Sequence, residues 1–502
     1  MKSMKTNRIW SIFRIIALVI LIGAEAFAVT VILQLNMLPE KYFAIMLAVL
    51  VVLTVYTALL LFWNGKKKVK IFLRIVACIM VLVMLLGCVL VSKIAWDAHN
   101  FMDNVTGGDD LPSTRNSYVL VRNEDAAQSL KDTKGYRYGA VENYDVEHTE
   151  QMLGVIQQET GEAVALTEYK QAALMVDALY NKQADALIMN GASISLLIEQ
   201  PAYEDFLDRA RILYTLPYED TTQKEENKPN NEKVEAGSPF VVYISGSDTR
   251  SQKLYVSRSD VNILAVVHPQ TKQVLLLNTP RDYYVPNPAG KGALDKLTHC
   301  GNYGVDCSVK ALEDLYNVDI THSCQINFSG FEKMIDAIGG ITIYSETSFY
   351  TVEGYIQKGE NHLNGVRALS FARERYNLSG GDNARGKNQM KVIKAVIDKM
   401  TSSTTLISKY AEILKSLEGM FATSFQSEEI SELVKMQLTD MAKWNVQSFA
   451  VTGTGGYGET YSAPGEELYI MHPNEATVEY ASGLIQRVLK GETLTAEDMK
   501  MP

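Results

Sequence analysis

Three long apolar runs open the chain and predict its first elements. Residues 15–35 contain a single charged residue, and residues 42–63 and 75–91 contain none. A helix needs roughly 20 apolar residues to cross a hydrocarbon layer, so the pattern predicts membrane-spanning helices at about 15–35, 42–63 and 75–92, within an anchor of residues 1–95. We do not expect a cleavable signal peptide, because the long runs follow one another without a small-residue cleavage site.

The pattern changes after the third run. Between residues 112 and 220, strand-like runs such as 118–121 and 186–189 alternate with amphipathic helical stretches such as 148–160 and 169–181. This alternation predicts a small α/β domain. It carries no recognisable catalytic constellation, so we expect an accessory or docking role for it.

A polar segment separates this accessory domain from a larger one. Residues 221–239, TTQKEENKPNNEKVEAGSP, contain one large apolar residue, Val234, which is typical of a linker. After it, the pattern predicts buried strands at 240–245, 261–268 and 273–278, helices at 308–316, 330–338 and 383–400, and a last strand and helix within 469–489. Residues 240–490 are therefore expected to form an α/β domain with a mixed sheet covered by helices, followed by a tail at 491–502.

Charge divides the chain at the same place. The chain has 58 acidic and 48 basic side chains, but residues 1–92 hold ten Lys/Arg and two Glu, so the net charge of −10 separates into +8 there and −18 in the rest. Basic residues precede the first run and fill residues 66–74, whereas the first loop has only Lys41. Since basic loops stay cytoplasmic, we expect a multi-pass cell-membrane protein with a cytoplasmic N-terminus and extracytoplasmic α/β domains. The acidic exterior argues against nucleic acid as a partner.

The five cysteines follow this division. Cys78 and Cys88 lie in the third run, where they are expected to pack as apolar residues. Cys300, Cys307 and Cys324 lie in the oxidising exterior, where Cys300 and Cys307 could close a short disulfide loop or one of them could pair with Cys324. The sequence has no CxxC motif or Cys/His cluster, so we expect no structural zinc site.

Charged residues gather at the predicted strand ends of the larger domain. Arg258 and Asp260 lie two residues apart at the start of a strand, and Arg373 and Arg375 repeat this spacing in SFARERY, so each pair is expected to leave one face. Two further pairs follow the first and third strands: Asp248 and Arg250 in GSDTR, and Arg281 and Asp282 in TPRD. Polar groups at successive strand ends of an α/β sheet converge on one crevice.

The helix predicted at 383–400 adds to this crevice. Asp382 is expected to be its N-cap, with Arg385 in the first turn and Gln389 one turn later on the same face. A helix N-terminus with an arginine beside it attracts phosphate. With Lys296 nearby, the crevice holds six arginines in an acidic region, which predicts an anionic ligand. The alternative is a surface ladder of salt bridges, which the neighbouring apolar strands make the weaker interpretation.

Two carboxylates in the crevice predict a metal ion. Asp248 and Asp260 offer hard oxygen ligands. Mg²⁺ is often held by only one or two protein carboxylates together with waters and phosphate oxygens, whereas Ca²⁺ takes more ligands than we find. The pattern therefore predicts a diphosphate substrate with bound Mg²⁺.

Seven segments in order carry a family resemblance. They are GSDTR (246–250), RSD (258–260), TPRDYYV (279–285), KLTHCGNYG (296–304), FSGFEKMIDAIGGITI (328–343), LNGVRALSFARER (363–375) and GDNARGKNQ (381–389). Each is weak alone, but the ordered set is specific, and it resembles the LytR-CpsA-Psr family over about residues 240–489. The accessory domain and the several membrane spans resemble the capsule-attachment branch of that family.

The resemblance implies a Mg²⁺-dependent phosphotransferase. It would transfer an anionic glycopolymer, of the capsular polysaccharide or teichoic acid type, from an undecaprenyl-diphosphate carrier in the membrane to peptidoglycan, forming a phosphodiester; polysaccharide synthesis machinery is a further implied partner. By position, the implied site comprises the metal ligands Asp248 and Asp260, the diphosphate ligands Arg258, Arg281, Arg373, Arg375, Arg385 and Gln389, and the catalytic residues Arg281, Asp282, Arg373 and Arg375. Asp282 would be the base for the sugar hydroxyl, and residues 328–343 would help to line a groove for the polyprenyl tail.

Three positions depart from the family pattern. Asn388 stands where a second helix arginine is expected, Asn278 stands where a serine usually precedes the PRD segment, and Cys300 replaces a small residue after His299. These changes bear on substrate preference more than on reaction class, because the acids and most arginines are present.

Other functions give different expectations. A hydrolase of the same lipid diphosphate would use the same residues with water as acceptor, and a non-catalytic envelope regulator would bind polyprenyl phosphates without turnover. GTGGYG at 453–458 matches a dinucleotide motif, but Pro464 and Gly465 interrupt the helix it would need. For His299 we favour a structural hydrogen bond over catalysis.

Overall fold

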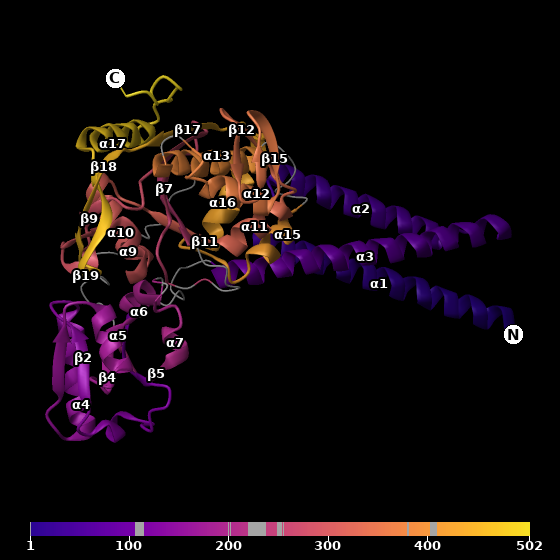
Figure 1. Ribbon diagram of the computed structural model, residues 1–502. Coiled ribbons are helices and arrows are strands. Elements are labelled where there is room, and N and C mark those ends of the chain that lie inside the picture. The colour runs from indigo at the N-terminus through magenta and orange to yellow at the C-terminus, as the bar shows by residue number, and fades with distance from the viewer. Residues whose placement is uncertain are drawn as a thin grey trace. The chain divides into compact units, whose positions relative to one another are not determined.

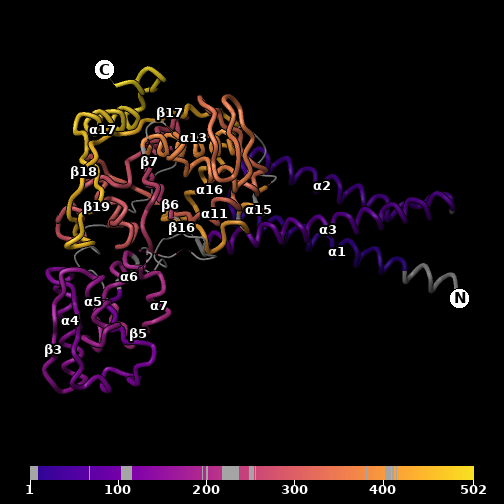
Figure 2. Tube along the Cα trace, viewed as in Figure 1, coloured from indigo at the N-terminus to yellow at the C-terminus, as the bar shows by residue number. Residues whose placement is uncertain are grey.

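The chain is described over most of its length by a computed structural model. The described residues are 2–105, 115–198, 200, 202–218, 237–247, 254, 256–378, 381–401 and 409–501. The predicted site residues Asp248 and Arg250 lie outside them. Contacts divide the chain into two compact units, Met1–Thr106 with Met400–Glu418 and Phe425–Lys443, and Gly107–Lys399 with Gly419–Ser424 and Trp444–Pro502. Figure 1 labels the elements, and Figure 2 lets the trace be followed along the chain.

The first unit is built on three long helices. They are α1 (Lys2–Leu35), α2 (Glu40–Phe62) and α3 (Lys67–Val105), with α15 (Tyr410–Leu417) and α16 (Ser427–Asp440) in the same unit. Each long helix is long and apolar enough to cross a membrane, as predicted. Leu21, Leu61 and Ala77 are fully buried among them. Glu25 of α1 accepts a hydrogen bond from Thr54 Oγ1 of α2 at 2.6 Å, which gives this intramembrane carboxylate a partner.

The accessory domain is a five-stranded sheet in the order β3-β2-β4-β1-β5. Its elements are β1 (Arg115–Arg122), β2 (Arg137–Val141), α4 (Val146–Thr160), β3 (Ala165–Tyr169), α5 (Ala172–Tyr180), β4 (Ala186–Asn190), α6 (Gly191–Ile198), α7 (Phe206–Arg209) and β5 (Ala210–Tyr218). Alternate residues of β4 face opposite sides, so Leu187 packs with Met175 of α5 and Ile188 packs with Met152 of α4. The predicted small α/β domain is confirmed.

The larger domain contains a mixed six-stranded sheet in the order β16-β11-β6-β7-β8-β17. Its strands are β6 (Phe240–Ser247), β7 (Val261–His268), β8 (Gln273–Asn278), β11 (His322–Asn327), β16 (Phe421–Thr423) and β17 (Asn445–Ala450). The pairs β6/β11 and β8/β17 are parallel, while β7 runs antiparallel to both of its neighbours, β6 and β8. The predicted mixed sheet is therefore confirmed.

Helices cover both faces of this sheet (Figure 1). On one face, α10 (Val305–Tyr316) and α17 (Glu475–Leu489) pack on Tyr243, Leu264 and Leu277, which are fully buried. The other face carries α11 (Phe328–Ala337), α12 (Gly365–Arg373) and α13 (Gly381–Thr401). Since strands buried on both faces read as continuous apolar runs, this explains the sequence pattern of β7 and β8.

Short antiparallel strand pairs lie outside the six-stranded sheet. They pair β9 (Tyr284–Pro286) with β10 (Leu294–Lys296), β12 (Ile341–Ser345) with β15 (Gly359–Leu363), β13 (Phe349–Thr351) with β14 (Gly354–Ile356), and β18 (Gly453–Thr460) with β19 (Ala463–Pro473). GTGGYG lies in β18 and is followed by a strand rather than a helix, which confirms that it is not a dinucleotide-binding turn.

Candidate active site

The antiparallel strand β7 brings the candidate residues to one edge of the sheet. Val261 at its start pairs with Gly246 near the end of β6, and Ile263 pairs with Asn278 at the end of β8. The segment before β7 and the segment after β8 therefore leave the sheet side by side. These segments carry Arg258 with Asp260 and Arg281 with Asp282, as the strand-end pattern predicted.

Asp260 and Arg281 form the centre of this edge. Arg281 Nη1 donates to Asp260 Oδ1 at 2.9 Å, and both side chains are largely buried. Burial alone would raise the pKa of Asp260, but the positive charges of Arg281, Arg258 and Arg385 outweigh it and hold the pKa below its usual value. The structure thus gathers three of the predicted arginines around one ionised carboxylate.

Buried hydroxyls fix the loop before β7. Tyr243 Oη lies 2.7 Å from Asn262 Oδ1, to which it can donate its one hydrogen, and 2.9 Å from Ser259 Oγ, while Ser245 Oγ lies 2.8 Å from Ser259 Oγ. Gly301 packs so closely on this loop that a Cβ there would lie 2.6 Å from Ser259 N. The position of Arg258 is consequently determined by neighbours on both sides.

Asp282 lies between two cations. Lys296 Nζ donates to its Oδ1 at 3.0 Å, and Arg281 Nε lies 3.6 Å from its Oδ2. Both carboxylate oxygens of Asp282 therefore lie close to a cationic side chain. This arrangement suits a role for Asp282 in orienting Arg281 and Lys296, and its assignment as a base stays a prediction.

His299 belongs to a buried hydrogen-bond network rather than to the arginine cluster. Its Nδ1 lies 2.6 Å from Asp295 Oδ1. The other oxygen of Asp295 accepts from Asn287 Nδ2 at 2.9 Å and from the hydroxyl of Ser462. Burial opposes the charge of Asp295, but His299 and these donors hold its pKa below the usual value. The geometry supports the predicted structural role of His299.

Helix α13 contributes Arg385 and Gln389, which are both buried. The helix begins at Gly381, so Asp382 lies in its first turn, and its predicted role as N-cap stays a prediction. Asn388, at the position where an arginine was expected, donates from Nδ2 to the carbonyl of Phe371 at 3.2 Å. It joins α13 to α12.

A close approach of α13 to the sheet fixes the position of Arg385. A Cβ at Gly386 would overlap the side-chain amide of Asn278, at the end of β8. We therefore expect Gly386→Ala to displace the helix and to lower turnover of the diphosphate donor that the family resemblance implies on the order of 10- to 100-fold. Asn278→Ser, which shortens the opposing side chain, should restore much of this loss.

Gly483→Ala is the matched control for Gly386→Ala. Gly483 also lies inside a helix, α17, but a Cβ there meets nothing within 4 Å. This change should leave turnover unaltered and slightly raise the melting temperature, because alanine favours a helix. Equal turnover in Gly386→Ala and wild type would show that the contact does not hold Arg385 in place.

The predicted strand-like geometry of Arg373 and Arg375 is wrong. Arg373 is the last residue of α12, whose N-cap Asn364 accepts from the Arg367 N–H at 3.1 Å. The guanidinium of Arg373 lies 4.5 Å from the ring centre of Phe328, directly after the end of β11. Arg375 follows in a loop. The apolar positions of VRALSFA repeat with helical spacing, and this signal outweighs the two-residue spacing of the charges.

The three cysteines of the larger domain are thiols in the structure. Cys300 and Cys307 are fully buried, and hydrogen bonding to Cys307 together with burial raises the pKa of Cys300 well above its usual value. Cys324 of β11 lies 3.3 Å from Thr423 Oγ1. The disulfide considered for Cys300 and Cys307 stays a prediction.

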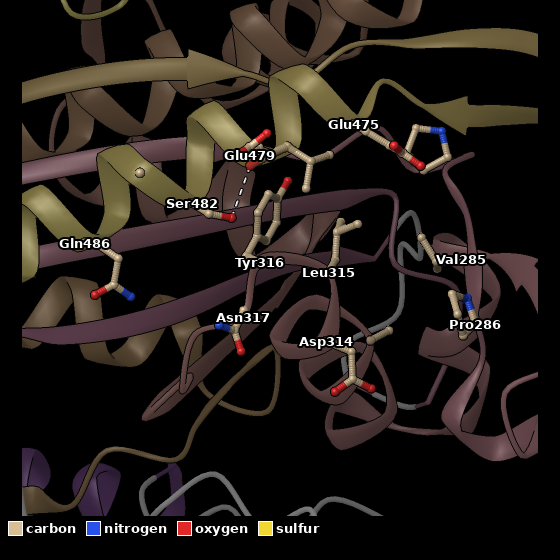
Figure 3. Close-up of a pocket in the computed structure, with 14 residues that line it drawn as sticks. Val285, Pro286, Asp314, Leu315, Tyr316, Asn317, Glu475, Glu479, Ser482 and Gln486 are labelled. Atoms are coloured by element: carbon tan, nitrogen blue, oxygen red, sulfur yellow. Dashed lines mark hydrogen bonds between the residues drawn. The ribbon is translucent and has the colours of Figure 1, made fainter.

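A groove on the face of the sheet that α10 and α17 cover is lined by acidic side chains, which would repel a diphosphate. It has a volume of about 1020 Å³ and lies between α10 and α17. Figure 3 shows Glu475 and Glu479 of α17 and Asp314 of α10 around its apolar floor of Leu315 and Tyr316. No arginine lines this groove, so the candidate site stays at the arginine edge.

Some residues of the site were not recognised from the sequence. Tyr243 and Ser245 read only as strand residues, and Gly386 read as an ordinary helix position. A glycine inside an otherwise regular helix was the one available signal for the contact with Asn278. Lys296 was noted as nearby, but its pairing with Asp282 was not.

Comparison with known proteins gives consistent matches. A model of the LytR_cpsA_psr family matches residues 213–477. The polyisoprenyl-teichoic acid–peptidoglycan teichoic acid transferase TagU of Enterococcus faecalis is 30% identical over 246 residues, which cover 48% of this chain and 80% of that protein. The protein of the same name from Oceanobacillus iheyensis is 32% identical over 262 residues, covering 50% and 76%. The crystal structure of Bacillus subtilis TagV is 26% identical, covers 51% of this chain and 99% of that chain, and gives a TM-score of 0.43.

Proposed function

This chain belongs to the LytR-CpsA-Psr family, and from this premise we propose that it is a membrane-anchored phosphotransferase of the bacterial cell wall. It transfers an anionic glycopolymer from a polyprenyl-diphosphate carrier to peptidoglycan. The named relatives, which are teichoic acid transferases that use a polyisoprenyl-linked donor, support the donor and acceptor classes. The N-terminus is cytoplasmic and the α/β domains lie outside, as the basic loops indicate.

The observation that carries the proposal is the arginine cluster around Asp260. Arg258, Arg281 and Arg385 come from three separate segments and lie within electrostatic reach of one carboxylate. Diphosphate cleavage depends on neutralising charge on the transferring phosphoryl group and on the leaving phosphate. Such a cluster suits that task better than it suits a surface ion-pair ladder, because Arg281 and Asp260 are largely buried.

The proposed transfer exchanges one P–O bond for another and changes no oxidation state. The acceptor hydroxyl oxygen bonds to the phosphorus nearest the glycan, and the bond from that phosphorus to the bridging oxygen breaks. Polyprenyl phosphate leaves with the bridging oxygen, and the hydroxyl proton passes to solvent or to a base. The arginines bind the two phosphates, while Asp282 and Lys296 keep Arg281 in position.

A Mg²⁺ ion fits the donor set. Within the described residues the only ion pair of Asp260 runs through Oδ1 to Arg281, and its lowered pKa keeps it ionised. Asp260, together with Asp248, would hold the ion, which prefers such hard oxygen ligands beside phosphates. When bound, it adds positive charge at the diphosphate oxygens.

Turnover by the full chain in detergent tests the proposal. With Mg²⁺ and a polyprenyl-diphosphate glycan, the wild type is expected to release polyprenyl phosphate. Adding peptidoglycan oligomers should yield a product joined by a new phosphodiester. Free glycan phosphate in place of that product would favour a hydrolase, and lipid binding without any turnover would favour a binding regulator.

A further inference from the structure

The hairpin β13–β14 presents aromatic side chains to solvent. Tyr350 and Tyr355 are 68% and 48% exposed, and their rings lie 5.0 Å apart at 52°. The opposite side of the hairpin is buried, since Phe349 stacks on Phe371 of α12 at 5.8 Å and Ile356 is fully buried. The hairpin is therefore anchored by one face and holds two tyrosines on the other.

The loop after α12 is tied to this hairpin. Glu374 Oε1 accepts from the backbone N–H groups of Tyr376 and Asn377, both at 2.9 Å. Asn377 Nδ2 then donates to the carbonyl of Tyr350 at 3.1 Å. Tyr376, which is 84% exposed, therefore belongs to the same surface as the hairpin tyrosines. Arg375 stacks on its ring at 4.7 Å and donates to its hydroxyl at 2.6 Å.

This surface continues directly from the candidate active site. Arg373, two residues before Arg375, lies at the ring of Phe328 beside the sheet edge that carries Asp260. A glycan joined to a diphosphate at that edge has to leave across a neighbouring surface. Exposed tyrosines suit the apolar faces and hydroxyl edges of sugar rings, because each pairs an apolar ring with a polar tip.

We propose that Tyr350, Tyr355 and Tyr376 form a stacking platform for the glycan of the donor, with Arg375 binding its anionic groups. The proposal rests on the proposed function and names the part of the substrate that this surface takes. The glycan is the occupant we favour, because Arg373 and Phe328 connect this surface to the sheet edge that carries Asp260; a membrane surface is the alternative that the experiment below distinguishes.

Two donors of different length test the platform. The full chain in detergent is given a polyprenyl diphosphate with one sugar and one with several anionic sugar units, and KM is measured for each. In Tyr350→Ala/Tyr355→Ala and in Tyr376→Ala, the ratio of the KM for the long donor to that for the short donor should rise roughly tenfold. Tyr→Phe changes keep the rings and should largely retain the wild-type ratio.

Tyr457→Ala is the matched control, because Tyr457 is also exposed, at 74%, but lies on the β18–β19 hairpin. Its KM ratio should equal that of the wild type. An unchanged ratio in the platform variants would overturn the platform while leaving the proposed function intact. A KM increase for both donors that appears only in lipid nanodiscs would assign the tyrosines to the membrane and also overturn it.

The two proposals can fail separately. If the wild type releases no polyprenyl phosphate, the proposed function fails, and titration of the carrier-free anionic glycan into the full chain tests the platform alone. Binding that is lost in Tyr350→Ala/Tyr355→Ala but kept in Tyr457→Ala would support it. Equal binding by all three proteins would overturn it.

Discussion

Arg281→Ala is expected to lower release of polyprenyl phosphate about 10³-fold, the largest effect of any single change in this chain. Arg281 contacts both central carboxylates, through Nη1 to Asp260 and Nε toward Asp282. Removing it deletes a charged donor to the diphosphate and leaves two largely buried carboxylates without that partner. Release of the labelled lipid phosphate by the full chain measures the effect.

Two variants make this result specific. Arg281→Lys keeps the charge but loses the planar pair of donors, so it should recover only part of the activity. Arg487→Ala removes an arginine whose partners, Glu492 and Asp498, lie on the surface, and it should turn over at the wild-type rate. Wild-type turnover in Arg281→Ala would remove this residue from the proposed site.

Asp260→Asn is expected to lower turnover by about 10²-fold and to raise the Mg²⁺ concentration needed for half-maximal activity. The surrounding arginines hold the pKa of Asp260 below its usual value, so the carboxylate stays charged at neutral and mildly acidic pH. Its contribution should be lost only as pH falls through that lowered pKa. Turnover is measured against Mg²⁺ concentration at two pH values. This separates the change in the Mg²⁺ requirement from the loss of the carboxylate's charge.

Asp314→Asn is the control for Asp260→Asn. Asp314 is an exposed carboxylate on α10 that pairs with Lys310, and its loss should not alter the Mg²⁺ requirement. A melting temperature for each variant shows whether Asp260→Asn has only destabilised the fold. An unchanged Mg²⁺ requirement in a folded Asp260→Asn protein would contradict the metal assignment.

The sequence predicted the sheet and its edge because both have local signals. β7 and β8 are continuous apolar runs, and the charges of RSD and TPRD stand directly at their ends. Once β7 is antiparallel to its neighbours, these ends must meet. The sequence pattern alone therefore predicted which end of the sheet carries the candidate site.

The parts that could not be predicted depend on contacts between distant segments. Nothing local shows that Asp282 meets Lys296, or that Gly386 meets Asn278. The hairpin β13–β14 has strands of three residues, which are too short for an alternating pattern to be distinguished from a loop. For α12, the apolar residues have helical spacing, but the two-residue spacing of Arg373 and Arg375 in SFARERY led to the incorrect prediction of strand-like geometry.

The spread of the site along the chain has a consequence for biogenesis. Its candidate residues within the described part of the chain come from the segment before β7, the segment after β8, the end of α12 and the start of α13. Strand β7 must pair with β6 and β8 before the first two segments can meet. Pairings between distant segments form late in folding. A chain still emerging from the membrane therefore cannot cleave the carrier lipids around it, and activity begins only when the whole domain is complete.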